Sequence, residues 1–443
     1  MSVRRHRGWW IVLLWLMAGP VTGWAADDSI PADSGHIGWM LVSSSLVLLM
    51  TPGLAFFYGG LVRRKNVLSI LMQCFMSMCL MTVLWVVVGY SLAFGESISA
   101  SSWGGIIGGL DHLFLRGVSF EASGDIPEML FMIFQCMFAI IAPALILGAF
   151  AERLKFSAYC VFSALWLLLV YCPVCHWVWG GAEGFFGLGN DGALDFAGGT
   201  VIHINAGIAA LVAAVMLGKR QGYPEKTSPP HNLPFAVLGA GLLWVGWFGF
   251  NAGSAGAANA TAVNAFVVTH VATAAAGLTW SIIDWVVNKK PTCLGIITGV
   301  VAGLVAITPA AGCVSVMGSL GVGFGASLLA YIAVNLKERL GYDDSLDVFG
   351  VHGVAGIWGA IAAGLWATAS IPGNETNGLF YGNPSQVPLQ LKAVFYTLVW
   401  SGLISFILLK LVDVTMGLRA GERDERVGLD LTEHAETAYT LVD

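Results

Sequence analysis

The sequence predicts an all-α, polytopic membrane protein with eleven transmembrane helices. Of its residues, 57% are hydrophobic and 11% are charged, whereas a soluble domain usually carries about 25% charged residues. Eleven apolar segments are long enough to cross a bilayer, and Lys and Arg gather in alternate loops between them. The net charge of -6 is spread over loops, and no basic run indicates that the chain binds nucleic acid.

The apolar segments give the expected helices in order. Each is long enough to cross a hydrocarbon layer of ~30 Å at about 1.5 Å of rise per residue. Many of the 56 glycines lie inside these segments, which predicts a closely packed bundle. We expect helices over residues 37–61, 67–94, 127–150, 156–179, 197–218, 233–257, 262–287, 292–311, 314–335, 348–369 and 389–417.

The distribution of Lys and Arg predicts the orientation. Basic residues occur at 63–65, 152–155, 219–226, 289–290, 337–339 and from Arg419 onward, in every second loop. The other loops are acidic, with Arg116 as their single basic residue. The positive-inside rule therefore places the N-terminus outside and the C-terminus in the cytoplasm, which agrees with an odd number of spans. In a bacterium the membrane is then the cytoplasmic, or inner, membrane.

The chain divides into three parts. Residues 1–26 have a basic start, a short apolar core and small residues near Ala25, a pattern typical of a cleaved signal peptide. A retained extra helix is the alternative. Residues 27–417 form the transmembrane domain, and residues 418–443 form a cytoplasmic tail.

Two segments echo each other. The fifth expected helix begins DFAGGTVIH and carries His203, and the tenth begins DVFGVHG and carries His352. These helices run in opposite directions, which predicts an inverted 5+5 repeat with the eleventh helix left over. Such repeats place a substrate site near the membrane midplane. We expect the two histidines to meet there, because ionisable groups inside a membrane are costly and usually functional; hydrogen bonding between helices is the alternative.

The acids before these histidines have a simpler expected role. Asp195 and Asp347 each start a helix, where a carboxylate accepts backbone N–H groups. Asp195 also follows a glycine-rich outer loop, so we expect it to help attract a cation. No function is assigned to His270, nor to Cys172 and Cys175, which we expect to be small buried side chains without a metal.

Aromatic residues are expected above the histidine pair, toward the outer face. Taken singly, each is as well explained by the aromatic belt of a membrane protein or by core packing. Together they resemble a cation–π vestibule above a lane without carboxylates. Such a lane suits ammonium, which can leave a proton behind and continue as a neutral molecule. The residues are Phe134, Phe138, Trp179, Trp247, Phe250 and Ser254.

These segments resemble the Amt/Mep/Rh family of ammonium transporters, in its bacterial branch. The resemblance runs from about residue 37 to the tail. It rests on TPGLAFFYGGLVRRKNVLS (51–69), ALILGAFAERLKFSA (144–158), HWVWGG (176–181), GALDFAGGTVIHINAG (192–207), WFGFNAGSAG (247–256), TPAAG (308–312) and DVFGVHGVAGIWG (347–359).

The resemblance implies a role for each of these residues. Trp179, Phe138 and Ser254 would recruit ammonium, with Phe134 and Trp247 as neighbouring aromatics. Phe138 and Phe250 would form a stacked gate, and His203 and His352 would line the conduction lane. Asp195 would be a structural and electrostatic support. Tyr171 and Thr308 match family positions near the pathway.

The resemblance also implies partners. It indicates a homotrimer that conducts ammonium or ammonia and methylammonium, without a cofactor. A signal protein of the PII type would bind at the cytoplasmic face. An enzyme is not expected, because no nucleophile–base pair, metal motif or phosphate loop is present. Three alternatives stay open: proton relay through the histidines or electroneutral conduction, an ammonium sensor acting through the tail, and a channel for carbon dioxide.

Overall fold

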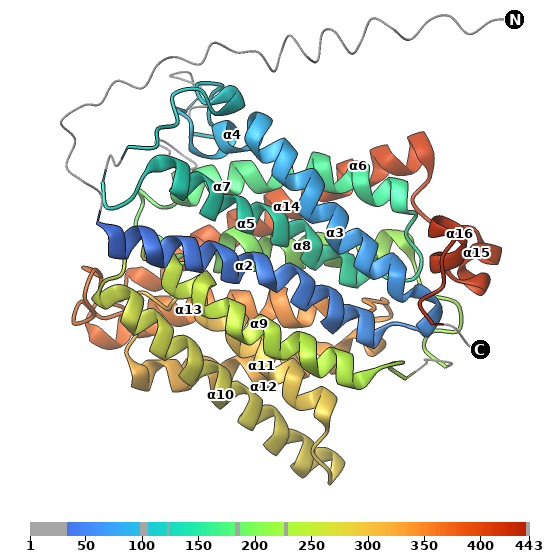
Figure 1. The fold of residues 1–443 in the computed structure, drawn as a ribbon. Coiled ribbons are helices and arrows are strands. Elements are labelled where there is room, and N and C mark those ends of the chain that lie inside the picture. The colour runs from blue at the N-terminus through green and yellow to red at the C-terminus, as the bar shows by residue number, and fades with distance from the viewer. Residues whose placement is uncertain (1–32, 98–104, 122–123, 182–186, 226–228, 440–443) are drawn as a thin grey trace, which may run out of the picture. The chain divides into compact units, whose positions relative to one another are not determined.

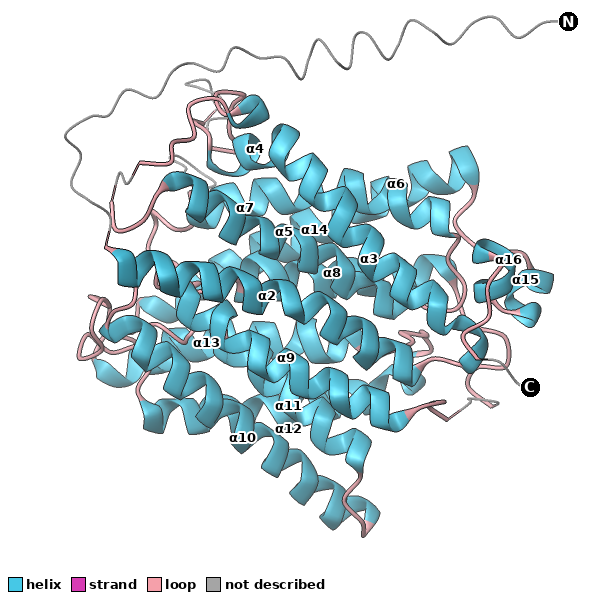
Figure 2. Ribbon diagram, in the orientation of Figure 1, coloured by secondary structure: helices cyan, strands magenta, loops and turns pink. Residues whose placement is uncertain are grey.

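The computed structural model describes residues 33–97, 105–121, 124–181, 187–225 and 229–439, and within them every regular element is helical (Figure 2). The expected signal peptide lies outside the described residues. Ten helices in the described part are long and apolar enough to cross a membrane. They are Ser34–Leu61 (α2), Arg64–Phe94 (η1, α3, η2 and α4), Glu128–Phe150 (α5), Phe156–Trp179 (α6, η4 and α7), Gly199–Leu217 (η5 and α8), Leu233–Gly253 (α9), Ala260–Asn288 (α10), Val316–Leu340 (α12), Phe349–Trp366 (η6 and α13) and Gln386–Met416 (α14).

The remaining expected span is shorter than predicted. Helix α11 covers Cys293–Ile307, so its 15 residues reach only about 22 Å. It ends there because Pro309 lacks a backbone N–H and the chain turns through residues 308–313. Most of α11 is buried among other helices. A helix that meets protein along most of its length does not need to match the thickness of the lipid.

The basic loops lie together at one end of the helices. Arg63 and Arg220 both contact Glu152, and Arg220 also pairs with Asp343. Arg419 donates to the carbonyl of Leu217 at the same end. We call this the basic end, and the opposite end, which carries Trp179 and Asp195, the aromatic end. This clustering of basic residues at one end agrees with their occurrence in every second loop of the sequence. The assignment of the basic end to the cytoplasm stays a prediction.

Short π-helical segments interrupt several spans. In the described residues they are Trp85–Gly89 (η2), Leu167–Tyr171 (η4), Gly199–Ile204 (η5) and Phe349–Val354 (η6). Such segments are rare and are frequent at functional sites. The last two carry His203 and His352, so the π-helical winding indicates that this pair belongs to a functional site.

The two histidine segments pack reciprocally. Segment η5 contacts η6 and α13, and η6 contacts η5 and α8. The closest approach is at Gly207 and Gly353, where a Cβ atom added to Gly207 would overlap the Gly353 backbone. In the view of Figure 1, the labels of α8 and α13 lie between those of α3 and α10. This reciprocal arrangement is what the inverted-repeat prediction requires at the centre of the protein.

Candidate functional site

The two predicted histidines meet in the interior. His203 is 1% exposed and His352 is 2% exposed. Their Nδ1 atoms lie 3.3 Å apart, and their rings are nearly parallel, with centroids 5.4 Å apart. In a hydrogen bond between two Nδ1 atoms one ring must donate and the other must accept, so at least one imidazole is neutral. The sequence prediction that the histidines come together is confirmed.

A narrow cavity runs beside the pair. Its volume is about 10 Å³, and its lining includes His203, Trp247, Phe250 and His352 among apolar side chains. That space corresponds to roughly one water molecule. None of its lining residues is acidic. We call this cavity the lane; it has room for about one small molecule.

A much larger cavity opens at the basic end. It holds about 470 Å³ and is lined by charged residues, among them Arg63, Glu152, Arg220 and Asp347, and by His352. His352 therefore belongs to both cavities. His352, together with Phe57, lies where the narrow apolar lane meets this wide polar vestibule.

Four aromatic rings form a cluster that meets the lane at Phe250. Phe138 and Phe250 are fully buried, and their centroids lie 4.5 Å apart at an interplanar angle of 64°. Phe138 also contacts Phe134 at 4.9 Å and Trp179 at 6.0 Å, again edge to face. The expectation of a stacked phenylalanine pair is wrong in its geometry: the rings meet edge to face, which is a favoured arrangement of aromatic quadrupoles.

Trp247 and Thr308 form a second pair next to the lane. The Trp247 ring stacks on His203 with centroids 5.3 Å apart and an interplanar angle of 17°. Its indole Nε1–H donates to Thr308 Oγ1 at 2.9 Å. Thr308 in turn donates to the carbonyl of Leu304. Trp247 therefore supports His203 beside the lane, and Thr308 holds Trp247 in place.

Ser254 and Tyr171 do not line the lane. The Ser254 hydroxyl donates to the carbonyl of Phe250 at 2.8 Å, at the end of α9. Its oxygen keeps lone pairs that can accept a further hydrogen bond. Tyr171 is fully buried between Trp85 and Trp166 and does not line the lane.

Asp195 caps the segment that carries His203. Its two carboxylate oxygens accept four backbone N–H groups, from Gly198, Gly199, Thr200 and Val201, at 2.6 to 3.0 Å. Gly198 has a φ of 112°, a conformation that glycine adopts without strain. The Asp195 carbonyl also accepts from Trp179 Nε1 at 2.8 Å. The capping prediction is confirmed, and one residue ties the aromatic end to the histidine segment.

The acid before His352 behaves differently from the expectation. Asp344, not Asp347, accepts the Phe349 N–H at the start of η6, at 2.7 Å. Asp347 has a φ of 62° and its side chain forms an ion pair with Lys337. Burial raises the pKa of Asp344 to about 6 despite the nearby Lys337. The capping expectation for Asp347 is wrong, because the backbone turn places the carboxylate of Asp344, three residues earlier in the chain, at the start of the helix.

Comparison with known proteins identifies the family. A model of the Ammonium Transporter Family matches residues 38–439. The chain is 48% identical over 409 residues to the ammonium transporter of Bacillus subtilis (strain 168), covering 91% of this chain and 98% of that relative. The chain belongs to the ammonium transporter family. It is therefore a multi-pass membrane protein that transports ammonium, and it is not an enzyme.

Solved structures support this placement. Mep2 of Candida albicans matches the transporter with a TM-score of 0.82 at 35% identity, covering 92% of this chain and 91% of that one. A structure titled Sensor Amt Protein matches with a TM-score of 0.83 at 28% identity, covering 90% of this chain and 98% of that one. The proteins in both structures thus share this arrangement of helices with the transporter.

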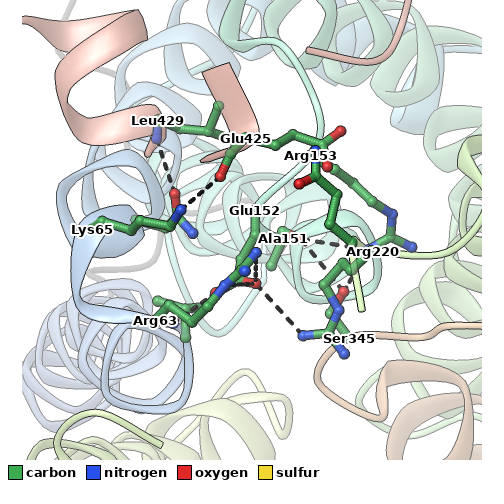
Figure 3. A network of polar contacts seen from close by, with 12 residues as sticks. Arg63, Lys65, Ala151, Glu152, Arg153, Arg220, Ser345, Glu425 and Leu429 are labelled. Atoms are coloured by element: carbon green, nitrogen blue, oxygen red, sulfur yellow. Dashed lines mark hydrogen bonds and ion pairs between the residues drawn. The ribbon is translucent and has the colours of Figure 1, made fainter. Parts of the chain in front are cut away.

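The transporter carries a buried charge network at its basic end (Figure 3). Arg153 is fully buried and donates to the carbonyl of Asp343 and to the Ser345 hydroxyl. Burial lowers the pKa of Arg153 to about 10. Asp343 accepts two hydrogen bonds from the Arg220 side chain, and this partner holds the pKa of Asp343 below its usual value. The network fixes the loop that leads into η6 and His352.

The tail docks on the same network. Glu425, in α15 (Glu422–Val427), pairs with Arg419, and its carbonyl accepts from Lys65. At α16 (Leu429–His434), Leu429 N–H donates to Asn66 Oδ1 at 2.9 Å. Figure 3 shows Lys65, Glu425 and Leu429 close together above Arg63 and Glu152. The sequence indicated a tail of this length, but not the residues that hold it.

The remaining sequence candidates fall outside the lane. Cys172 and Cys175 are fully buried, as expected. Within the described residues, no group of His, Cys, Asp and Glu side chains is arranged to hold a metal ion. His270 is exposed on α10 and its ring lies 5.4 Å from that of Trp244. No function is assigned to these three residues.

Proposed function

We propose that this transporter recruits ammonium at the aromatic end, removes a proton there, and passes neutral ammonia through the lane. The observation that carries the proposal is the pair of His203 and His352 beside a cavity of about 10 Å³ without an acidic lining residue. Trp179, Phe138 and Ser254 would form the recruitment site, with Phe134 beside it. Phe138 and Phe250 would act as the gate.

The energetics favour the neutral species. Moving a small ion from water into a medium of low dielectric constant costs of order 20 kcal/mol by the Born estimate, unless a counter-charge or hydrogen bonds replace the water. The lane supplies no carboxylate, and it has room for about one small molecule. Ammonia can donate to one imidazole nitrogen and accept from another. Deprotonation removes the charge that the lane cannot stabilise.

The proton that ammonium loses can stay at the aromatic end, which makes transport electroneutral, or it can be relayed through the two histidines. His203 Nε2 has no partner, while the two Nδ1 atoms share a hydrogen bond, so the pair can exchange a proton with a neighbour at either end. A relay through both rings would make transport electrogenic. An ammonium pulse applied to the protein on a supported membrane tests this. A transient current that His203→Ala abolishes supports the relay, and active protein without charge movement rejects it.

Uptake of methylammonium tests the proposed function itself. Vesicles that contain the protein should accumulate methylammonium faster than empty vesicles of the same lipid. Equal rates would reject transport by this chain. Trp179→Leu, which removes the recruiting ring and the hydrogen bond to Asp195, should raise the KM.

We further propose the assembly and placement that the family resemblance implies. The chain has eleven spans with the basic end in the cytoplasm, forms a homotrimer in the inner membrane, and is made with a cleaved signal peptide. The docked tail offers the surface for a PII-type signal protein. Cross-linking in native membranes would detect trimers, and labelling of an introduced cysteine in the tail only from the cytoplasmic side would test the orientation.

Sensing through the tail is the second candidate function. It is favoured by the docking of Glu425 and Leu429 on Lys65 and Asn66 at the basic end, and by the likeness to the structure titled Sensor Amt Protein. A sensor would bind ammonium without moving it. Normal binding of ammonium together with uptake no faster than in empty vesicles would favour this function over transport.

A further inference from the structure

A glutamine on the last long helix makes four hydrogen bonds inside the protein, one of them accepted from Gln386 Nε2 at 3.3 Å. Gln390, near the start of α14, is 1% exposed. Its Oε1 accepts from the Leu194 N–H at 2.6 Å, and its Nε2 donates to the Leu194 carbonyl at 2.7 Å. The same nitrogen donates to the carbonyl of Ala360 at 3.1 Å. The side chain therefore pairs with the backbone of Leu194 as a neighbouring strand would.

The groups that Gln390 holds lead directly to both histidines. Leu194 precedes Asp195, whose carboxylate caps η5 and whose carbonyl holds Trp179. Ala360 lies on α13, which continues from η6 and His352. Gln390 thus links the entry of one histidine segment to the helix that follows the other.

Neighbouring residues on α14 strengthen this link. Gln386 is also buried, and its Nε2 donates to the carbonyl of Gly192 at 2.8 Å. Further along the helix, Ser401 donates to the carbonyl of Asn205, directly after η5. Helix α14 lies outside the expected inverted repeat, yet it contacts the chain on both sides of η5. Helix α14 therefore holds the chain in place on both sides of η5.

We propose that Gln390 is a positioning residue for the conduction lane: by joining Leu194 to Ala360 it sets the position of Asp195 and the spacing of His203 and His352. The inference rests on the proposed function, because it concerns transport through that lane. Gln390 does not line the lane and does not touch the transported molecule.

The chemistry of an amide explains why this position requires glutamine. One end of the side chain must accept a hydrogen bond and the other must donate. Methionine has a similar length but can do neither well, and an ionised carboxylate can only accept. A protonated carboxyl can accept hydrogen bonds but donate only one, so glutamate that carries its proton can keep the pairing with Leu194 but not also the donation to Ala360.

The test uses three variants of the full-length protein in vesicles. Gln390→Met removes all of these hydrogen bonds, and Gln390→Glu retains the pairing with Leu194 only in its protonated form, without the second donation to Ala360. Thr397→Val is the matched control, because Thr397 is buried on the same helix and its hydroxyl has no hydrogen-bond partner. Methylammonium uptake and potassium leakage are measured at several pH values and normalised to the amount of folded protein.

We expect Gln390→Met to lower uptake about tenfold relative to wild type at every pH, and to increase potassium leakage relative to methylammonium uptake. Gln390→Glu should match it at about pH 7.5 and recover toward wild type at about pH 5. Thr397→Val should equal wild type. A general loss of fold stability would not produce the change in selectivity, which makes potassium leakage the informative readout.

Two results would overturn the proposal. One is wild-type uptake and selectivity in Gln390→Met; the other is a ratio of Gln390→Glu to wild type that does not change with pH. If Gln390→Met does not fold, the pH profile of Gln390→Glu decides alone. Wild-type vesicles that take up no methylammonium would instead reject the proposed function, so the two failures are distinguishable.

Discussion

Replacing Asp195 with Asn tests how strongly transport depends on the cap of η5. In the native protein Oδ1 accepts from Gly198 and Gly199, and Oδ2 accepts from Thr200 and Val201. Asparagine keeps the shape of the side chain and one oxygen. Its amide group is a donor, so it faces two N–H donors that no longer have a partner.

The size of the effect follows from those two lost acceptors. A buried donor left without a partner costs about 1–3 kcal/mol, so the change destabilises the native position of η5 by about 2–6 kcal/mol. Each 1.4 kcal/mol corresponds to about tenfold in an equilibrium constant. Because η5 carries His203 and Asp195 also holds Trp179, we expect methylammonium uptake to fall by at least about thirtyfold.

The assay compares uptake into vesicles per amount of folded protein, with Asp191→Asn as the control. Asp191 lies at the same end and pairs with Lys392 at a partly exposed site, where an ion pair contributes about 0–1 kcal/mol. The control should transport normally. Wild-type uptake by Asp195→Asn would refute the capping argument, and equal losses in both variants would show that net charge matters instead of the cap.

Three further substitutions test other contacts. Gly207→Ala should abolish uptake, because the added Cβ would overlap the Gly353 backbone. The control Gly241→Ala, with no atom within 4 Å of the added Cβ, should transport normally. Normal uptake in both variants would contradict the close crossing of the two helices. Thr308→Val should lower uptake about tenfold by leaving the buried Trp247 N–H without its acceptor, and Thr308→Ser should restore it; a Val variant that equals Ser would show that the hydroxyl is not needed. At pH values above about 6, Asp344→Asn should raise the midpoint temperature of thermal unfolding in detergent, because the folded-state pKa of Asp344 is raised to about 6 and its ionisation opposes folding. The gain in midpoint temperature should shrink as the pH falls toward about 4. A gain that does not depend on pH would contradict this.

The sequence predicted those features that depend on residue type and spacing. Hydropathy and the alternation of charges located ten long helices to within a few residues, and the echo around His203 and His352 predicted their contact. The carboxylate of Asp195 at a helix start was sufficient to predict a cap. Each of these predictions uses contacts that are local in the sequence or forced by the membrane.

The features that were missed depend on contacts between distant segments. No pattern in the sequence distinguishes the π-helical winding of η5 and η6 from an α-helix. The choice of Asp344 over Asp347 depends on a turn in which Asp347 adopts a positive φ. The sequence does contain a signal for Gln390, because a glutamine inside an apolar span is costly unless it is hydrogen-bonded.

The most direct test of the account measures selectivity in the histidine pair. Wild type, His203→Ala and His352→Ala are compared in vesicles for methylammonium uptake and for potassium uptake. We expect wild type to move methylammonium and exclude potassium, and each single variant to lose uptake or to admit potassium, because the neutral hydrogen-bonding lane is broken. Normal methylammonium uptake with potassium still excluded in both variants would contradict the central claim.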